Sequence, residues 1–437
     1  MEKLYLGVSR KIITPKVGCH LFGYSPDIIS RKVEDDLTAT VFFFSQGGKK
    51  ALMISLTLCL LENRLTDRIS EMIESRFSIE KQNFMISATH THSGPNTSGM
   101  VGWGDMDGEY IENVLIGSIV TCVEEAIENK EAVEMGYGIE NCYACVNRRE
   151  VRNDNSVVLG QNPDGNFDPR MTVLSFKNEE GVVVANLIHY AGHGTSAGAN
   201  TEISRDWHGV LTDKLESFSG AVTAFFNGAD GDIGPRLSTG KTLSEGEIKY
   251  IYETGNIAGD DSIRIFKGID NYCQRELVCG GGDVSVSLKK RISFEKAKAV
   301  YEMYGENAVN YQAAIRNFAK RVMDSYENGE SDSEKMTFKQ TVIEIGNIVF
   351  VSFPFELFSH IGMCIDGEYG DKTILPLSHT NGSMGYFITE DAKDGGGYEV
   401  DMFNFAEKTQ QYRDNAYLEL IENTVRHIND VLCEEEE

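Results

Sequence analysis

The stretch FMISATHTHSGPN occupies positions 84–96 and joins a strand pattern to two histidines. Apolar and small polar residues alternate in its first half, which is typical of a buried β-strand. Alternate residues of a strand share a face, so His90 and His92 are expected to continue the apolar face that begins at Phe84. Functional groups cluster where the strands of α/β sheets end. Two imidazoles at this place therefore favour metal binding or catalysis over a role in the core.

The segments on either side predict an α/β fold with a mixed β-sheet core flanked by helices. Apolar strand patterns are separated by short turns, and the turns GGKK and NEEG and the pair Gly346–Asn347 each predict a hairpin. Apolar residues at helical spacing predict amphipathic helices. The expected strands are 38–44, 50–61, 83–92, 171–190, 221–228 and 337–354, and the expected helices are 63–77, 109–128 and 415–432.

The 437 residues are expected to form a single domain, 1–437, because no linker or internal repeat interrupts them. Residues from about 238 to 335 differ from the rest in being rich in charge and glycine. They contain one long helical pattern, FEKAKAVYEMYGENAVNYQAAIRNFAKRVM. We interpret them as a helical, charged insertion.

The net charge of −26 and the pI near 4.8 argue against nucleic acid and anionic membranes as partners, because both would repel the chain. No apolar run reaches the roughly 18 residues of a membrane span, so no stable membrane insertion is expected. The start MEKLYLGVSRKIITPK lacks the pattern of a signal peptide. Nine scattered cysteines are typical of reduced thiols, and together these features predict a cytoplasmic location.

Other candidate ligands also follow apolar runs. LIHYAGHGTSAG contains His189 and His193, and SFPFELFSH contains Glu356. A carboxylate after a buried strand is costly unless it is paired, although Glu356 could instead begin a helix. The passage NGADGDIGPR brings Asp230 and Asp232 into a glycine-rich loop, which is equally typical of a plain turn. It is not a phosphate-binding P-loop, because the lysine and the Ser/Thr are missing.

Taken together, the motifs resemble those of the neutral, non-lysosomal ceramidase family. In chain order they are ITPKVGCHLFGY, ISATHTHSGPN, VNRR, HGTSAGANTEISRDWHG, NGADGDIGP, FPFELF and GYFITEDAKDGGGYE. THTHSGP is specific by itself, and the order of the others strengthens the resemblance across positions 13–399. The resemblance implies a ceramidase-like catalytic domain and a zinc amidase that uses one Zn²⁺ per chain.

Site residues are carried over by their motifs. The resemblance implies that the first histidine of THTH, the histidine of HGTS, the glutamate of FPFEL and the tyrosine of GYF bind the zinc. In this sequence they are His90, His193, Glu356 and Tyr386.

Three further residues are implied to line the reacting pocket. His92 would lie beside the metal, and Arg148 of VNRR and Tyr398 of GYE would contact the substrate or its oxyanion. Without the resemblance, Arg148 would pass for a surface residue of a basic run. Asp232 is our candidate for the general base, because its loop is expected to face the metal.

Two residues of SRDWHG, Asp206 and His208, could orient His193 from behind, or could be only a helix cap and its neighbour. Cys142 and Cys145 form a lone C-x-x-C without a second pair at zinc-finger spacing, so a metal or redox role is not favoured.

The sequence departs from the family in three places. Ceramidases carry a required serine where this chain has Gly234 in GDIGP. They usually continue into a C-terminal β-sandwich, whereas this chain ends near the last motif, and they are usually exported. The resemblance therefore implies the fold and the metal more strongly than a sphingolipid substrate.

We expect a zinc-dependent hydrolase that cleaves an amide, or an ester, of a small soluble N-acyl compound with metal-activated water. One alternative is an amidase of ceramide or another N-acyl lipid, with a neighbour such as Ser238 replacing the serine. The other is a catalytically silent metal- or ligand-binding relative. Zinc fits nitrogen and oxygen ligands, although manganese or iron stays open, as does the oligomeric state.

Overall fold

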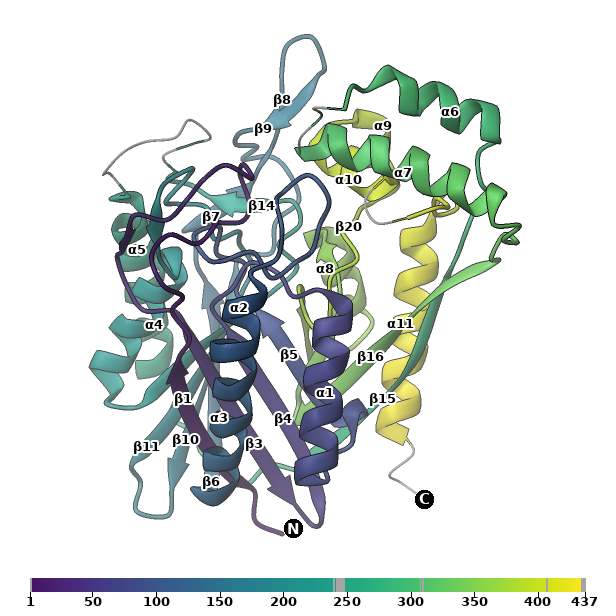
Figure 1. Ribbon diagram of the computed structural model, residues 1–437. Helices are drawn as coiled ribbons and strands as arrows, with labels where there is room; N and C mark the ends of the chain where they lie inside the picture. The colour runs from purple at the N-terminus through teal and green to yellow at the C-terminus, as the bar shows by residue number, and fades with distance from the viewer. Residues whose placement is uncertain are drawn as a thin grey trace.

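The protein is described from a computed structural model, in residues 2–238, 240, 248–306, 308, 310–405 and 408–433. The expected α/β class is confirmed. Two β-sheets pack face to face, and helices cover their outer faces, so that the layers run helix, sheet, sheet, helix (Figure 1). The first strand begins and the last helix ends at the lower end in this view, opposite a crown of loops.

The first sheet has eight strands in the order β13-β11-β10-β6-β1-β3-β4-β5. It is mixed, because β4 with β5 and β11 with β13 are parallel pairs, whereas its other neighbours run antiparallel. Its strands are β1 (Tyr5–Ile12), β3 (Thr38–Gln46), β4 (Lys49–Leu56), β5 (Phe84–Ala88), β6 (Glu131–Asn141), β10 (Arg170–Asn178), β11 (Val183–Tyr190) and β13 (Val222–Asn227).

This sheet is strongly curled, so that strands far apart in its order approach each other. The ring centroids of Phe42 on β3 and Phe226 on β13 are 6.3 Å apart. The hydroxyl of Ser55 on β4 donates to the backbone carbonyl of Phe225 on β13, at 2.7 Å. The curl brings the ends of β5 and β13 close together, and this proximity shapes the site described below.

Four helices cover the outer face of the curled sheet. They are α1 (Asn63–Phe77), α3 (Ile116–Glu128), α4 (Asp206–Ser219) and α5 (Tyr250–Lys267). Helix α1 begins where the Glu62 carboxylate accepts from the Leu65 amide at 2.9 Å, and it ends at Ser78 in the left-handed conformation. Its predicted bounds are confirmed, because its apolar residues recur at helical spacing and both ends are capped.

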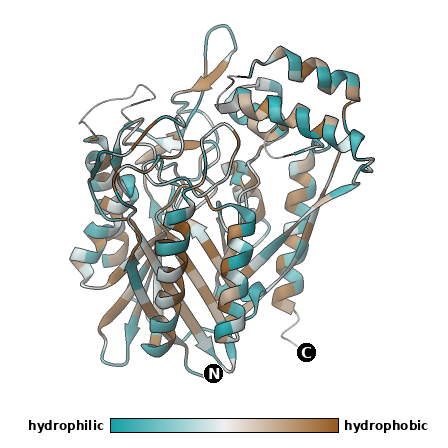
Figure 2. Cartoon of the chain, in the orientation of Figure 1, coloured by the Kyte–Doolittle hydropathy of each residue, from teal (hydrophilic) through white to brown (hydrophobic). Residues whose placement is uncertain are grey.

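The second sheet has the order β15-β16-β17-β19. One face packs apolar side chains against the inside of the curled sheet, and the other is covered by α8 and α11. Figure 2 shows hydrophobic residues concentrated on the strands, with hydrophilic residues on the outward sides of the helices. The elements are β15 (Leu277–Ser287), β16 (Lys335–Ile345), β17 (Ile348–Ser352), β19 (Thr373–Leu377), α8 (Ser359–Gly367) and α11 (Ala416–Cys433).

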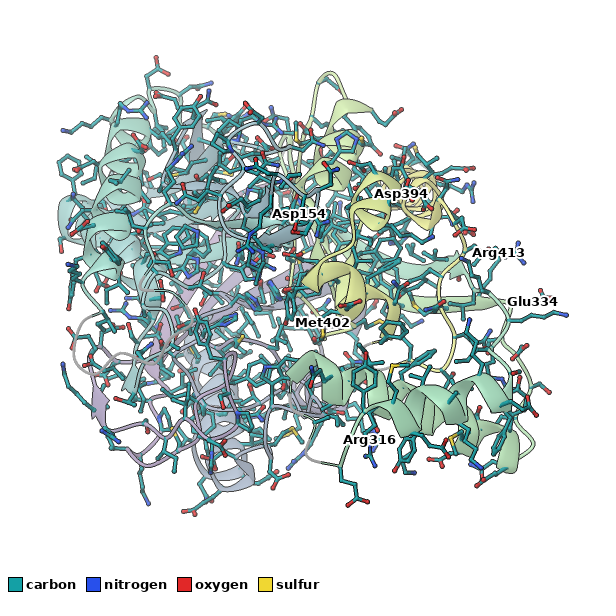
Figure 3. The ribbon with its side chains drawn as sticks, turned by 90° about the horizontal axis from the view of Figure 1, so that it is seen from above. Asp154, Arg316, Glu334, Asp394, Met402 and Arg413 are labelled. Carbon is teal, nitrogen blue, oxygen red and sulfur yellow. The ribbon has the colours of Figure 1, made fainter. Side chains whose placement is uncertain are left out.

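The remaining elements lie mostly in the crown of loops and on its flank, whereas η1 precedes β5 at the opposite end of the sheets. They are β2 (Lys32–Val33), η1 (Lys81–Asn83), α2 (Gly108–Tyr110), η2 (Ile111–Leu115), β7 (Cys145–Asn147), β8 (Arg149–Val151), β9 (Val157–Leu159), β12 (Glu202–Ile203), β14 (Ile233–Pro235), α6 (Phe294–Met303), α7 (Asn310–Glu327), β18 (Glu356–Leu357), β20 (Tyr386–Phe387), α9 (Glu390–Gly395) and α10 (Tyr398–Phe405). In the view from above, Asp154 of the β8–β9 turn and Met402 of α10 are labelled on the crown, and Arg316 marks α7 (Figure 3).

Part of the segment interpreted as an insertion belongs to the layered core. Within 238–335, α5 packs on the curled sheet and β15 pairs with β16 along its whole length, whereas α6 and α7 lie outside both sheets. The long helical pattern forms two helices rather than one. Residues 239, 241–247, 307 and 309 of this segment lie outside the described residues. The single domain over 1–437 stays a prediction.

The strand expected to reach His92 is shorter than predicted. Strand β5 ends at Ala88, and His90 takes the left-handed conformation with φ +67°. Simple alternation along one strand therefore does not place the two histidines. Among the described residues, no helix is long and apolar enough to cross a bilayer.

Candidate metal centre

Five strands end at one place below the crown of loops, and a polar side chain follows each of them. Beyond the ends of β5, β11, β13, β17 and β19 stand His90, His193, Asp230, Glu356 and His379. All five are buried, with at most 6% of their surface exposed. The ends of the two sheets therefore bring together polar groups from distant parts of the chain.

Backbone hydrogen bonds join the sheets at this point. The Ala88 amide donates to the carbonyl of His379 at 3.1 Å, and the Ser378 amide donates to the carbonyl of Asn227 at 3.2 Å. The end of β19 is thus wedged between β5 and β13, which the curl of the first sheet has brought together.

The loop after β5 turns the His90 imidazole inward. The His90 amide donates to the Leu58 carbonyl at 2.9 Å, and ring atom Nδ1 lies 3.0 Å from the Cys59 carbonyl oxygen. Because a carbonyl can only accept, Nδ1 carries the proton and Nε2 keeps its lone pair. A non-glycine residue with φ +67° is uncommon and is held there by its surroundings.

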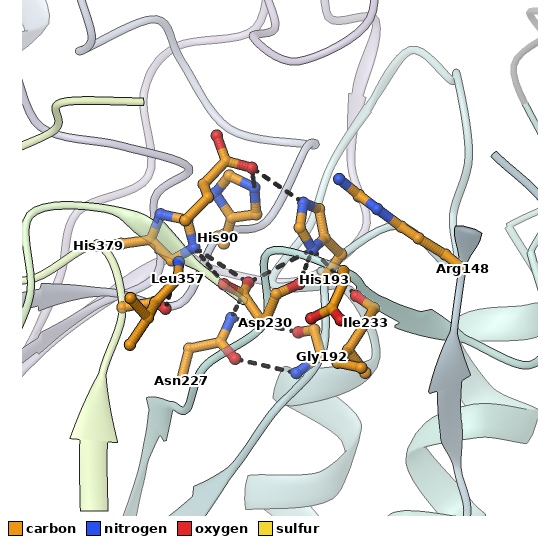
Figure 4. Close-up of polar contacts among 12 residues, drawn as sticks. His90, Arg148, Gly192, His193, Asn227, Asp230, Ile233, Leu357 and His379 are labelled. Carbon is orange, nitrogen blue, oxygen red and sulfur yellow. Dashed lines mark hydrogen bonds and ion pairs between the residues drawn. The ribbon is translucent and has the colours of Figure 1, made fainter. Parts of the chain in front are cut away.

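His193 is fixed in the same tautomer by two carbonyls. Its Nδ1 donates to the backbone oxygens of Asp230, at 2.9 Å, and Ile233, at 3.0 Å (Figure 4). Its Nε2 therefore also presents a lone pair. The close packing of the glycine-rich loop supports this geometry, since a Cβ on Gly231 would lie 2.5 Å from the Glu356 carbonyl oxygen.

Three atoms that can act as metal ligands converge at one point. Glu356 Oε2 lies 3.2 Å from His193 Nε2 and 3.6 Å from His90 Nε2. Ligand atoms about 2.0–2.1 Å from a tetrahedral zinc ion are roughly 3.4 Å from one another. The spacing fits a shared cation. The three residues therefore fit a metal ion in both donor chemistry and spacing.

Tyr386 stands beside Glu356 because β18 and β20 pair in parallel with these two residues in register. The Arg148 guanidinium donates through Nη2 to the Tyr386 hydroxyl at 2.8 Å and through Nε to Glu399 Oε1 at 3.0 Å. The other Glu399 oxygen accepts from Arg149 Nη1 at 2.7 Å. The buried Glu399 thus holds two arginines, one of which reaches the tyrosine at the candidate centre.

His92 reaches the same place from the other side. Its Nε2 lies 3.2 Å from His90 Nε2, and its ring meets the edge of the Tyr24 ring at 5.2 Å between centroids. Gly23 packs on the ring, and a Cβ there would lie 2.3 Å from His92 Nδ1, so this position requires glycine. The Tyr398 ring lies 5.9 Å from that of Tyr386.

Asp232 does not point to this cluster. Its carboxylate accepts from the Ser359 amide at 2.8 Å, the Ser359 hydroxyl at 3.1 Å and Asn147 Nδ2 at 3.0 Å. These bonds connect the glycine-rich loop to the start of α8 and to β7. Its contacts give Asp232 a structural place and do not support its prediction as the general base.

One residue of the site, His379, was not predicted to act there. His379 Nε2 donates to both carboxylate oxygens of Asp230, at 2.9 and 3.0 Å, and its ring stacks on that of His90 at 3.9 Å. Asp230 was named among the candidate ligands of the glycine-rich loop, whereas His379 lies in PLSHTN, where a single histidine after a strand is too weak a signal.

Asp206 and His208 do not contact the His193 ring. The Asp206 carboxylate accepts from the amides of Ser196, at 3.1 Å, and Ala197, at 3.0 Å, and His208 donates to the Gly192 carbonyl at 3.1 Å. They order the backbone around His193, while its ring is oriented by main-chain carbonyls.

Burial shapes the protonation of the cluster. It raises the pKa of the Glu356 carboxyl to about 7, although His379, Tyr386 and Arg148 oppose it. It also lowers the pKa of His90 and of His193, and it lowers that of His92 to about 3, with Arg148 adding to the shift. The imidazoles are therefore neutral, as metal ligands must be.

The family assignment follows from a sequence profile described as "Neutral/alkaline non-lysosomal ceramidase, N-terminal", which matches residues 4–254, more than half of the chain. The chain belongs to the neutral/alkaline ceramidase family.

Two curated relatives illustrate its distance from other ceramidases. It is 25% identical over 208 residues to the neutral ceramidase of Pseudomonas aeruginosa and 26% identical over 269 residues to neutral ceramidase B of Dictyostelium discoideum. The matches cover 44% and 56% of this chain, but 30% and 37% of those proteins. The chain thus spans about a third of the length of the curated ceramidases it matches.

Solved ceramidase structures share the fold. The crystal structure of the neutral ceramidase from Pseudomonas aeruginosa covers all of this chain with a TM-score of 0.75 at 18% identity, and the chain covers 75% of it. A structure of ceramidase complexed with C2 gives a TM-score of 0.73 at 17% identity.

A pocket of about 1030 Å³ opens beside the candidate centre. His92, His193, Arg148 and Tyr386 line it, as does Gly234 of the glycine-rich loop. A Cβ on Gly234 would meet only the Arg148 side chain, at 3.4 and 3.6 Å, which is ordinary contact. Packing therefore does not require glycine at position 234.

Proposed function

We propose that this ceramidase-family chain is a zinc-dependent amidase with one Zn²⁺ bound by His90, His193, Glu356 and Tyr386. The observation that carries the proposal is the convergence of three atoms that can act as metal ligands, at 3.2 and 3.6 Å, beside a large pocket. Two neutral nitrogens with oxygen ligands and no thiolate suit zinc.

Zinc held there supplies Lewis-acid chemistry, in that it polarises a carbonyl oxygen and makes hydroxide available near neutral pH. The residues of the chain provide the rest. The Arg148 guanidinium, fixed by Glu399, lies where it can donate to an oxygen that gains negative charge, and its bond to the Tyr386 hydroxyl oxygen holds that proposed ligand in place. Tyr398 lines the same pocket and is proposed to contact the substrate.

We propose His92 as the group that accepts and returns the proton. It lines the pocket, and its Nε2 lies 3.2 Å from His90 Nε2 at the proposed centre. Asp232 was predicted for this role, but its two carboxylate oxygens are already occupied by Ser359 and Asn147.

The proposed substrate is a small soluble N-acyl compound whose amide, or ester, bond is hydrolysed. Polar groups on the pocket wall support this choice, among them Gln161, Arg236 and Asp401. The wall also has an apolar side, which favours ceramide or another N-acyl lipid as a second candidate: Ile28, Trp103, Val157, Val158 and Leu159. Ser238 lines the pocket, but its hydroxyl donates to the Thr195 carbonyl at 2.6 Å, so it is poorly placed to replace the serine.

The cytoplasmic location and the single catalytic domain stay predictions from the sequence. A catalytically silent relative would keep the fold and lose turnover. The retention of the whole proposed ligand set in one buried place argues against it.

The test combines metal analysis with a substrate panel. Purified wild-type protein, His90→Ala and His189→Ala would be analysed for metal and assayed with short N-acyl amides and with ceramide in detergent. His189 is a matched control, because it is a buried histidine that donates to the Pro376 carbonyl at 2.9 Å outside the cluster.

We expect about one zinc per chain in the wild type and in His189→Ala, none in His90→Ala, and cleavage of the short amides. Cleavage of ceramide alone would favour the second candidate. Stoichiometric zinc without turnover of any member of the panel would favour the silent relative, and a wild type that takes up no zinc would refute the metal centre.

A further inference from the structure

His379 and Asp230 form a buried pair behind the proposed zinc ligands. Neither the Asp230 carboxylate nor the His379 ring is exposed by more than 1%. The pair occupies a place where apolar side chains of similar size would avoid the cost of burying charge. The stability of the fold therefore does not explain why this pair is buried here.

Each member of the pair holds one of the two ligand imidazoles. The His379 ring lies flat on the His90 ring, with centroids 3.9 Å apart and 12° between the planes. The Asp230 backbone carbonyl accepts from His193 Nδ1 at 2.9 Å, while its carboxylate accepts from His379 Nε2 at 2.9 and 3.0 Å. Asp230 therefore connects both ligands through a continuous set of contacts (Figure 4).

The same geometry distinguishes the pair from a further metal ligand. Atoms of His90, His193 and Asp230 lie within 4.8 Å of one another, which would suit a cation. However, the Asp230 carboxylate faces the protonated side of His193, 3.5 Å from Nδ1, and not the lone pair on Nε2. Its Oδ2 also accepts from Asn227 Nδ2 at 2.9 Å. Asp230 thus lies behind the imidazoles, with its oxygens already occupied.

We propose that Asp230 and His379 are positioning residues of the metal centre. The carboxylate of Asp230 fixes the orientation of the His379 ring, which stacks on the His90 ring and holds it in place. The Asp230 carbonyl sets the tautomer of His193. This inference rests on the proposed zinc site. Outer partners of this kind typically contribute 10–100-fold to metal affinity.

The experiment uses the zinc-loaded protein and a competing chromophoric chelator to measure the zinc Kd. Asp230→Asn keeps the size of the side chain and an oxygen acceptor for His379 but removes the charge. His379→Gln keeps a donor for Asp230 but removes the ring. His189→Gln is the control, because His189 is likewise buried and has an Nδ1 without a partner among the described residues.

We expect the zinc Kd to rise about 10–100-fold in Asp230→Asn and in His379→Gln and to stay within about threefold of the wild type in His189→Gln. The visible absorption of Co²⁺ in the site should also shift in the two site variants, because the orientation of His90 changes. The unfolding temperature of each metal-free variant separates this effect from a loss of folding.

An unchanged Kd and an unchanged Co²⁺ spectrum in both folded site variants would overturn the inference while leaving the zinc site intact. Complete loss of zinc from Asp230→Asn, as severe as in His90→Ala, would also overturn the inference. Asp230 would then be a metal ligand and not a positioning residue. A wild type that binds no zinc would refute the proposed function and, with it, this inference.

Discussion

The apolar interior between the sheets and the polar centre at the strand ends lie only a few residues apart on the same strands. Strand β13 contributes Phe226 to the interior and is followed by Asp230 at the centre, and β19 contributes Leu377 and is followed by His379. All four side chains are at most 3% exposed.

The two regions are equally buried, but burial affects the free energy of folding differently in each. Burying the interior stabilises the fold through the hydrophobic effect, whereas burying charges and lone pairs at the centre opposes folding unless partners compensate. The comparison predicts that substitutions in the interior reduce stability and spare the metal, and that substitutions at the centre do the reverse.

The largest effect is expected for His90→Ala. Removal of a ligand that supports several kcal/mol of charge stabilisation should lower kcat/KM for the cleaved amide by about 10³-fold or more. The free energy of unfolding of the metal-free protein should change by less than about 1 kcal/mol, because the lost packing of the ring is offset by no longer burying a polar group. Steady-state kinetics and chemical denaturation with chelator present measure both. A destabilisation as large as that of a core truncation would break the comparison.

Phe226→Ala tests the other region. Truncation of a fully buried phenylalanine is expected to cost about 3–5 kcal/mol of unfolding free energy, while zinc content stays near one per chain in the folded protein. Phe218→Ala on α4 is the matched control, since Phe218 is 47% exposed, and it should cost less than about 0.5 kcal/mol. Loss of zinc from folded Phe226→Ala would show that the two regions are not separable.

The expected effect of Glu399→Gln is intermediate between those of the substitutions in the two regions. The substitution removes the carboxylate charge that pairs with Arg148 and Arg149 but keeps an oxygen acceptor. The free energy of unfolding is therefore expected to fall by about 2 kcal/mol. Arg148 should then position the Tyr386 hydroxyl poorly, with kcat falling more than KM rises. As a control, Asp283→Asn breaks an exposed pair with Lys339 and should change stability by less than about 0.5 kcal/mol. Equal stabilities of Glu399→Gln and the wild type would contradict the proposed importance of this charge.

Gly234→Ser is expected to have the smallest effect on folding. The added Cβ meets only the Arg148 side chain at ordinary contact distance, so the free energy of unfolding should stay within about 1 kcal/mol of the wild type. Thermal and chemical denaturation check this. A larger destabilisation would mean that glycine is required there by packing, and that the departure from the family pattern is structural.

Local patterns predicted much of the fold. Helix α1 and the hairpins β3–β4, β10–β11 and β16–β17 follow from periodicity and turn residues, which act over a few positions. The curl of the first sheet and the docking of β19 between β5 and β13 depend on contacts between residues more than a hundred positions apart. No local pattern encodes such contacts.

The candidate site shows the same limit. His90 and His92 were predicted as functional from their place near a strand end, but the expected alternation failed because β5 stops at Ala88. Asp232 was chosen over Asp230 as the candidate base within one glycine-rich loop, and only the fold turns Asp230 toward His379 and Asp232 toward Ser359.

X-ray absorption at the zinc edge of the loaded protein tests the central claim most directly. The account predicts a shell of nitrogen and oxygen ligands at about 2.0–2.2 Å that includes two imidazoles and no sulfur. A zinc–sulfur distance of about 2.3 Å would contradict it. That result would place the ion instead with Cys59, whose Sγ lies 3.4 Å from His90 Nδ1 and which could bind it together with His90 and His92.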